Sequence, residues 1–214
     1  MEEDHSRRPL KVRSTGWARV LAATLSKSGL SPNTISALSV VAAALGGLAF
    51  VAAGRGSINW TAGWLAGAAF IQARLICNLM DGMVAVEGGK KSPTGDLWNE
   101  VPDRIADPLL LVCAGWAVGL PWVGALAGWA AVMTAYVRAV GATLTGVQDF
   151  CGPFAKQQRM AALTAAALLT AADPLWNGSG QIMKIAVIAI AAGTGITLVR
   201  RLLRLAAKLN EAKP

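Results

Sequence analysis

The most restrictive feature of this sequence is that its apolar residues occur in long blocks separated by short polar segments. The chain has 214 residues, of which 54% are hydrophobic and only 15% are charged. Soluble domains carry about 25% charged residues, and a helix needs about 20 apolar residues to cross a bilayer. The blocks therefore predict an all-α membrane protein rather than a soluble domain.

The chain begins with a polar stretch followed by a helix that is apolar on one face. Residues 1–13 are charged and lack periodicity, so we expect a disordered cytoplasmic tail. Residues 14–30 contain an amphipathic helix suited to the membrane interface. The apolar face of this helix is formed by Trp17, Val20, Leu21 and Leu25. This segment is predicted to lie on the membrane rather than across it.

Residues 31–206 are long enough for six transmembrane helices with short loops, and 207–214 for a second cytoplasmic tail. The expected spans cover residues 32–53, 58–80, 95–118, 122–144, 157–173 and 181–206. Most of the 20 lysines and arginines lie at the two ends and in the loops after the second and fourth spans. Because cytoplasmic loops are enriched in these residues, both termini are expected on the cytoplasmic side of the inner membrane. The same placement accounts for the net charge of +8 without a nucleic-acid partner.

Polar side chains gather at the cytoplasmic ends of the second and third spans, although an ionisable residue inside a span costs about 2.5 to 3.5 kcal/mol. Asn78 and Asp81 are three residues apart and share one helix face, as do Asn99 and Asp103, four apart. A short loop should make the two helices antiparallel neighbours, so that these four side chains converge. Oxygen ligands alone suit Mg²⁺ or Mn²⁺. The competing interpretation is a polar clamp between helices, or side chains that reach the interface.

The stretch NLMDGMVAVEGGKKSPTGDLWNEVPDRIAD resembles the signature of the CDP-alcohol phosphotransferase family. That signature has Asp, two residues, Asp-Gly, two residues, Ala-Arg, eight residues, Gly, three residues, Asp, three residues, Asp. Four elements fall at the matching spacings here, namely Asp81-Gly82, Ala85, Gly95 and Asp103. The SPNTIS stretch from Ser31 and the succession of an interfacial helix and six spans are also similar to the family.

Three positions depart from this signature. Asn78 and Asn99 stand where the first and third acids are expected, and Val86 replaces the arginine. A shifted register, with Asp103 and Asp107 as the last two acids, would need a four-residue insertion, so we disfavour it. Asparagine offers a carbonyl oxygen without charge, so we expect weaker metal binding or a single ion. Nearby acids that could compensate are Glu87, Asp96 and Glu100.

The resemblance implies an enzyme that transfers a phosphatidyl or phospho-alcohol group from a CDP-linked lipid, such as CDP-diacylglycerol, to a small alcohol and releases CMP. It implies that Asp103 acts as the base on the acceptor hydroxyl. The implied ligands of Mg²⁺ or Mn²⁺ are Asn78, Asp81, Asn99 and Asp103. The implied contacts to the nucleotide part of the donor are Asn33, Thr34, Gly82, Ala85, Ser92 and Gly95.

A second, basic set of residues could hold a phosphate on the acceptor, and it comprises Arg138, Lys156 and Arg159. The ordinary interpretation is cytoplasmic loop charge for the last two and a structural ion pair for Arg138. Small residues four apart, such as Gly124 and Gly128, permit close packing either within the chain or in a homodimer.

Two other functions remain open. One is a catalytically weakened paralogue that binds lipid or regulates another membrane protein. The other is a small transporter, which the clustering of polar groups at one face, rather than at the midplane, disfavours.

Overall fold

The computed structural model describes residues 12, 15–90, 92–176 and 178–211, which contain helices and no β-strand. The α-helices are α1 (Gly16–Lys27), α2 (Pro32–Gly54), α3 (Trp60–Glu87), α4 (Gly95–Ala117), α5 (Pro121–Thr145), α6 (Lys156–Ala171) and α7 (Gln181–Glu211), and a 3-10 helix, η2 (Asp173–Trp176), lies between the last two. The predicted all-α class is therefore confirmed. The expected tail over 1–13 lies, except for one residue, outside the described residues.

Local sequence chemistry explains where several helices begin and end. Ser31 caps α2 by accepting a hydrogen bond from the backbone N–H of Thr34 at 3.1 Å, and Pro32 occupies the first helical position. Asn59 caps α3 in the same way through the N–H of Ala62. Helix α5 ends at Gly146, whose φ of 69° lies in the left-handed region that glycine adopts without strain.

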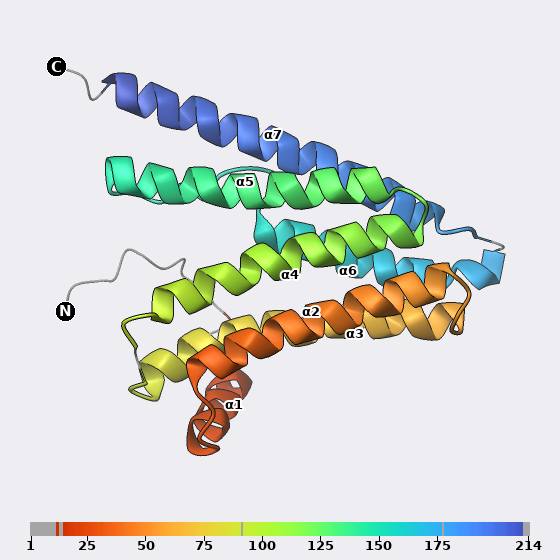
Figure 1. Cartoon of the computed structure of the whole chain (residues 1–214), viewed down its shortest axis with the longest axis horizontal. Helices are drawn as coiled ribbons and strands as arrows, with labels where there is room; N and C mark the ends of the chain where they lie inside the picture. Colours follow the sequence, from red (N-terminus) through yellow and green to blue (C-terminus); the bar gives the residue numbers. More distant parts are fainter. Residues whose placement is uncertain (1–11, 13–14, 91, 177, 212–214) are drawn as a thin grey trace.

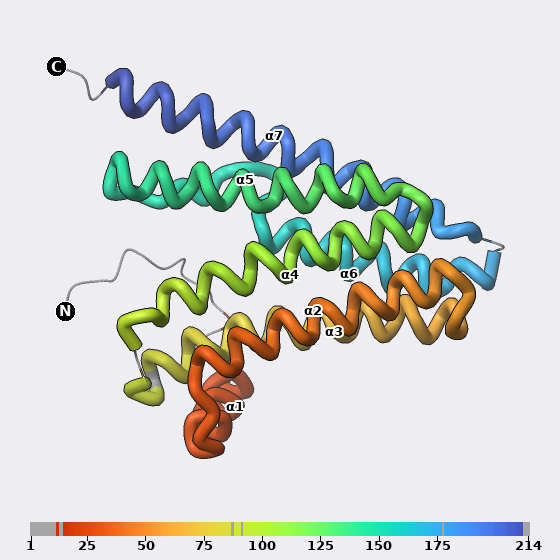
Figure 2. The backbone as a smooth tube through the Cα atoms, in the orientation of Figure 1, coloured from red at the N-terminus to blue at the C-terminus, as the bar shows by residue number. Residues whose placement is uncertain are grey.

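Helices α2 to α7 form a ring of packed neighbours. Figures 1 and 2 show this bundle from the side. Helix α2 packs against α3 and α4, α4 against α5, α5 against α7, α7 against α6, and α6 against α3. The ends of α3, α5 and α7 and the start of α4 lie toward the same end of this bundle (Figure 1). That arrangement puts the regions rich in lysine and arginine at one end.

Helix α2 separates α3 from α4 over most of their length, so the expectation that these two helices are direct neighbours is wrong. Small residues allow α2 to fit there. A Cβ atom added to Gly46 would come within 3.0 Å of the Cβ of Phe70 on α3, and one added to Gly47 within 2.8 Å of the sulfur of Cys113 on α4. Polar side chains of α3 and α4 must therefore reach one another through the ring interior.

The α4–α5 contact uses the small residues that the sequence spacing singled out. A Cβ atom on Gly124 would lie 2.5 Å from the carbonyl oxygen of Leu111, and one on Gly128 would lie 3.0 Å from the Cα of Pro108. These glycines therefore serve packing within the chain, and the expected homodimer stays a prediction.

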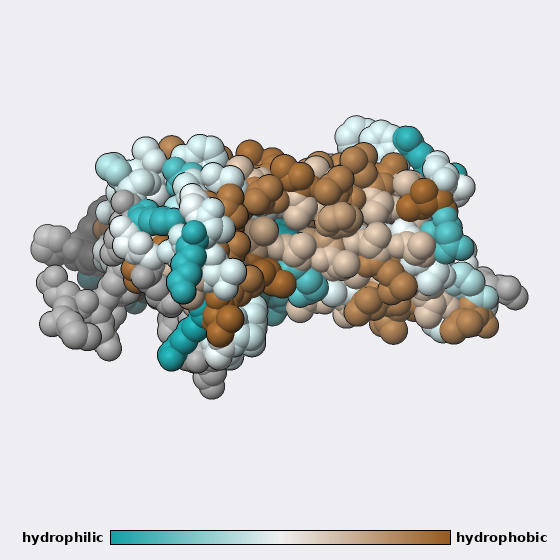
Figure 3. Space-filling model, turned by 90° about the horizontal axis from the view of Figure 1, so that it is seen from below, coloured by the Kyte–Doolittle hydropathy of each residue, from teal (hydrophilic) through white to brown (hydrophobic). Residues whose placement is uncertain are grey.

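On the face seen in Figure 3, a broad band of apolar residues covers the middle of the molecule, with more polar residues toward both ends. Helices α2, α3, α5 and α7 are long and apolar enough to cross a membrane. Helix α4 carries five charged residues, and α6 has only 16 residues. The apolar helices indicate an integral membrane protein, and the count of six spans stays a prediction.

Helix α1 packs against the last turns of α3, where Ala18 and Ala22 join a buried cluster with Met83 and Val84. This contact explains why α3 continues to Glu87, beyond the end expected from hydropathy. The opposite side of α1 exposes apolar side chains, such as Trp17, which is 51% exposed. Its location at a membrane interface stays a prediction.

The segment between α5 and α6 turns back along the bundle, so that α6 begins partway along it (Figure 2). Helix α7 holds this segment in place. Arg201 donates a hydrogen bond from Nε to the carbonyl oxygen of Cys151 at 2.9 Å, and the N–H of Phe154 donates to the hydroxyl of Thr197 at 3.1 Å. The first turn of α6 is thereby brought against the acidic residues of α4.

Candidate functional site

The carboxylate of Asp81 is buried between α2 and α3, with the residue only 4% exposed. The hydroxyl of Ser36 on α2 donates a hydrogen bond to Oδ2 of Asp81 at 2.6 Å. The backbone N–H of Gly82 donates to Oδ1 at 2.5 Å. Sequence reasoning did not single out Ser36, although a hydroxyl within an apolar helix, in the SPNTIS stretch, was an available signal.

Asp103 on α4 is held by cations from two other helices. Nη2 of Arg74, on α3, lies 2.6 Å from Oδ1 of Asp103, and the ammonium of Lys156 pairs with Oδ2. Arg74 is completely buried, and Asp103 is 7% exposed. Asp81, near the end of α3, is buried at the same end of the bundle. The two acids that the signature retains therefore share one region of the ring interior.

Asp107, one turn further along α4, extends the same network. Nη2 of Arg74 also lies 2.6 Å from Oδ1 of Asp107, and Nη2 of Arg159 lies 3.3 Å from Oδ2. Arg159 further donates to the carbonyl oxygen of Phe154 at 2.9 Å. Lys156 and Arg159 thus form internal ion pairs with α4. The sequence indicated the importance of Arg74 only through its charge within an apolar span.

A second ion-pair group connects α4 with α5. Nη2 of Arg138 lies 2.6 Å and 2.8 Å from the two carboxylate oxygens of Glu100, and Arg104 pairs with the same carboxylate. The structural ion pair considered for Arg138 is therefore present. Glu100 is already paired with two arginines and does not supply a spare acid.

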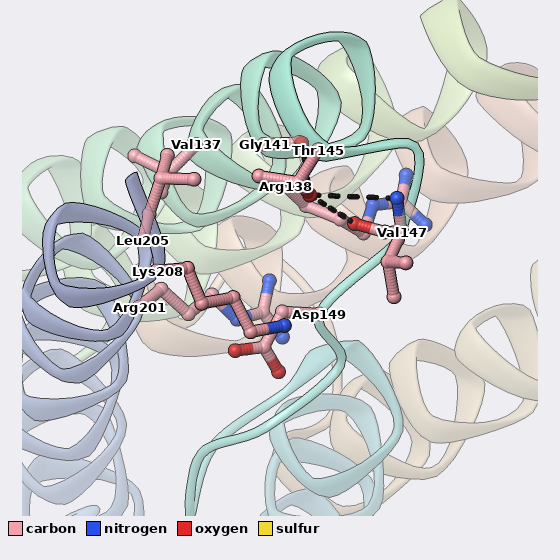
Figure 4. A pocket seen from close by; sticks show the side chains of 9 residues that line it. All are labelled: Val137, Arg138, Gly141, Thr145, Val147, Asp149, Arg201, Leu205 and Lys208. Carbon is pink, nitrogen blue, oxygen red and sulfur yellow. Dashed lines mark hydrogen bonds between the residues drawn. The ribbon is translucent and has the colours of Figure 1, made fainter. Parts of the chain in front are cut away.

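Arg138 also lines a small hollow, partly open to solvent, between α5, the following segment and α7 (Figure 4). Arg201, Lys208 and Asp149 lie around the same hollow. Burial alone would raise the pKa of Asp149. The hydrogen bonds from Cys151 and the positive charges of the nearby arginines outweigh this effect, so the pKa lies below its ordinary value. The lining therefore combines three cations with one ionised carboxylate. Sequence reasoning counted Arg201 and Lys208 only as cytoplasmic charge.

The residues expected along the nucleotide lie on three segments at this end of the bundle. Asn33 is half-buried and Thr34 exposed at the start of α2, while Gly82 and Ala85 are half-buried in the last turns of α3. Ser92 is exposed, and a Cβ atom added to Gly95 would meet only the hydroxyl of Ser92, at 3.7 Å. Packing within the chain therefore does not require glycine at position 95, so this position has room beside it.

The residues present do not fit a pair of divalent cations. Among the described residues, no group of three or more Asp, Glu, Cys or His side chains is placed to hold a metal ion. Both oxygens of Asp103 are engaged by cations, and Asn99 is exposed. Asn78 and Asn99 offer oxygen atoms without charge. A divalent ion at this site would have to displace the ammonium or the guanidinium that the protein itself supplies.

No protein-family model matches the sequence, and no curated protein matches it. Solved structures of the Mycobacterium tuberculosis phosphatidylinositol phosphate synthase PgsA1 share its fold. The CDP-DAG complex is 19% identical, with a TM-score of 0.71 over 88% of this chain and 92% of that chain. The complex with manganese and citrate is 19% identical, with a TM-score of 0.73 and 88% of each chain covered. The apo form is 20% identical, with a TM-score of 0.67 over 86% of this chain and 93% of that chain. This chain therefore has the fold of a CDP-alcohol phosphotransferase, the family that its signature stretch resembles.

Proposed function

We propose that this protein is a membrane-bound transferase that moves a phosphatidyl group from a CDP-linked lipid to a small alcohol and releases CMP. The observation that carries the proposal is the burial of the two retained signature acids, Asp81 near the end of α3 and Asp103 near the start of α4. The shared fold with a synthase that was solved with CDP-DAG supports the same donor class. The active site and both termini are proposed to face the cytoplasm.

The donor would lie with its diphosphate beside the cations of the α3–α4–α6 network and its nucleotide along the start of α2. The open position beside Gly95 and the half-buried Gly82 supply room for such a ligand. Lys156 is the most exposed cation of the network, with a side chain 28% exposed, and can turn toward the diphosphate. The acyl chains would remain in the bilayer along the apolar band of Figure 3.

In the transfer step, Asp103 would accept the proton of the acceptor hydroxyl. When Lys156 pairs with the diphosphate, one oxygen of Asp103 becomes free for this hydrogen bond. The acceptor oxygen then forms a bond to the phosphorus that carries the lipid. The bond from that phosphorus to the bridging oxygen breaks, and its electron pair leaves with CMP.

The basic hollow beside Arg138 is the proposed site for an acceptor that carries a phosphate, such as inositol phosphate or glycerol phosphate. Arg201 and Lys208 supply cations there beside the carboxylate of Asp149, and Arg138 would have to give up its ion pair with Glu100 to contact the phosphate. Guanidinium groups bind phosphate oxygens through paired hydrogen bonds. Lys156 and Arg159 were also expected at this site, but their ion pairs join them to Asp103 and Asp107 on α4.

A second candidate function is a lipid-binding or regulatory membrane protein without transferase activity. The specific observation in its favour is that both oxygens of Asp103 are occupied by cations. The absence of two signature acids, at Asn78 and Asn99, points the same way.

The test is to incubate the purified protein with CDP-diacylglycerol and a panel of alcohols and phosphorylated alcohols, and to identify lipid products by mass. We expect CMP release together with a new phospholipid for one class of acceptor. Asp103→Ala should abolish both products, whereas Asp96→Ala, at an exposed site on the same helix, should retain them. Wild-type protein that binds CDP-diacylglycerol without making a product would refute the transferase and favour the binding protein.

A further inference from the structure

The position of the missing first acid lies one helical turn from a buried cation. Asn78 lacks the carboxylate expected of the first acid, and Arg74 lies four residues before it on α3. Residues four apart share one face of a helix, so a cation stands beside the position of the missing anion. The buried guanidinium has no access to solvent, so its charge must be balanced within the protein.

Arg74 bridges two carboxylates in the way that a bound cation would. Its Nη2 atom lies 2.6 Å from an oxygen of Asp103 and 2.6 Å from an oxygen of Asp107. The other oxygen of Asp103 pairs with Lys156, and the other oxygen of Asp107 pairs with Arg159. Each of these two acids is therefore neutralised by two cations that belong to the protein.

No strong negative charge is left in this region of the described chain to attract a divalent ion. The three buried acids are matched in number by three cations of the same network, Arg74, Lys156 and Arg159. The nearby Glu100 is paired with two further arginines. Asp96 is exposed, and the side chain of Glu87 lies outside the described residues. A guanidinium in contact with two of the acids would also repel an incoming cation.

We infer that Arg74 takes the place of a divalent cation, so that the acidic site of this protein is assembled and neutralised without metal. The uncharged side chains at Asn78 and Asn99 and the buried arginine at position 74 then act together, with an internal cation in the place of an external one. A relative of the same fold was solved with manganese, so the difference can be measured directly. The inference concerns cation binding and holds whether or not the site transfers a phosphatidyl group.

The test is a manganese titration of the purified full-length protein in detergent, with free Mn²⁺ followed by electron paramagnetic resonance. We expect the wild type to leave the signal of free Mn²⁺ unchanged and to have the same melting temperature in EDTA as in Mn²⁺. Wild-type binding that disappears in Asp81→Asn would overturn the inference. The wild-type measurements need no variant, so they decide the matter even if a substituted protein does not fold.

The converse experiment restores the acids and removes the cation. The triple variant Arg74→Leu, Asn78→Asp, Asn99→Asp should acquire Mn²⁺ binding, whereas the control Asn210→Asp, the same type of substitution at an exposed position on α7, should not. A folded triple variant that binds no Mn²⁺ would count against the inference.

Activity measurements separate this inference from the proposed function. If the wild type transfers phosphatidyl groups, its activity should survive EDTA. Activity that EDTA abolishes and Mn²⁺ restores would overturn the inference and leave the transferase intact. Absence of transfer in every condition would instead refute the transferase, while the manganese titration would still decide the cation site.

Discussion

Replacing Arg74 with methionine should destabilise the folded protein strongly. Methionine fills part of the space of the arginine stem but carries no charge. The substitution removes the 2.6 Å contacts of Nη2 with both Asp103 and Asp107. Because the arginine is completely buried, water cannot take over its function in the folded state.

The structure allows the size of this effect to be bounded. Removing one partner of a buried ion pair destabilises by about 3 to 5 kcal/mol, because the other charge is left uncompensated. Asp103 keeps Lys156, and Asp107 keeps Arg159 at 3.3 Å, so we expect the lower end of that range, about 3 kcal/mol.

Arg104→Met provides the matched control, since it removes the same type of side chain from an ion pair. The side chain of Arg104 is 24% exposed, and that of its partner Glu100 is 46% exposed. Glu100 also keeps Arg138. Exposed pairs contribute about 0 to 1 kcal/mol, so this variant should lose less than about 1 kcal/mol.

The measurement is unfolding of the purified protein by SDS in mixed micelles, followed by circular dichroism. A double-mutant cycle with Asp107→Asn isolates the pair, because Arg74→Met should cost less when Asp107 is already neutral. Equal losses for Arg74→Met and Arg104→Met, or no coupling between Arg74 and Asp107, would refute the buried network.

Two further predictions concern packing and a buried hydrogen bond. Gly124→Ala should destabilise by about 1 to 3 kcal/mol in the same assay, since the new Cβ atom would lie 2.5 Å from a carbonyl oxygen of α4. A Cβ atom added to Gly195 would meet no atom within 4 Å, so Gly195→Ala should instead stabilise α7 by roughly 0.5 to 1 kcal/mol. Similar losses of stability for both variants would contradict the described helix contacts. Ser36→Ala should destabilise by about 1.5 to 3 kcal/mol, because Asp81 loses a hydrogen bond of 2.6 Å, and wild-type stability of this variant would show that the bond does not contribute.

Much of the helix pattern could be predicted because it is set by local chemistry. Serine and proline at the start of α2, and glycine after α5, mark boundaries that the structure places within one or two residues of expectation. The end of α3 could not be predicted in this way. Its last turns are stabilised by packing of Met83 and Val84 against α1, which is a tertiary contact.

The candidate site was predictable only in part. Spacing within each helix put Asp81 and Asp103 at the same end of the molecule, which needs no knowledge of helix packing. The partners of Asp103 depend on the segment between α5 and α6, which turns back and delivers Lys156 into the bundle. The position of α2 between α3 and α4 likewise depends on the helices that Gly46 and Gly47 pack against. A single sequence does not reveal which helices these are.

The position of Arg74 also has a consequence for biosynthesis. This arginine lies near the middle of α3, and the ribosome makes it before either of the aspartates that it pairs with. Until α4 follows, α3 would hold an unpaired charge in the bilayer, at about 2.5 to 3.5 kcal/mol. Pairing with the aspartates of α4 removes this cost. The ion-pair network is completed only after α6 has been synthesised and has joined them.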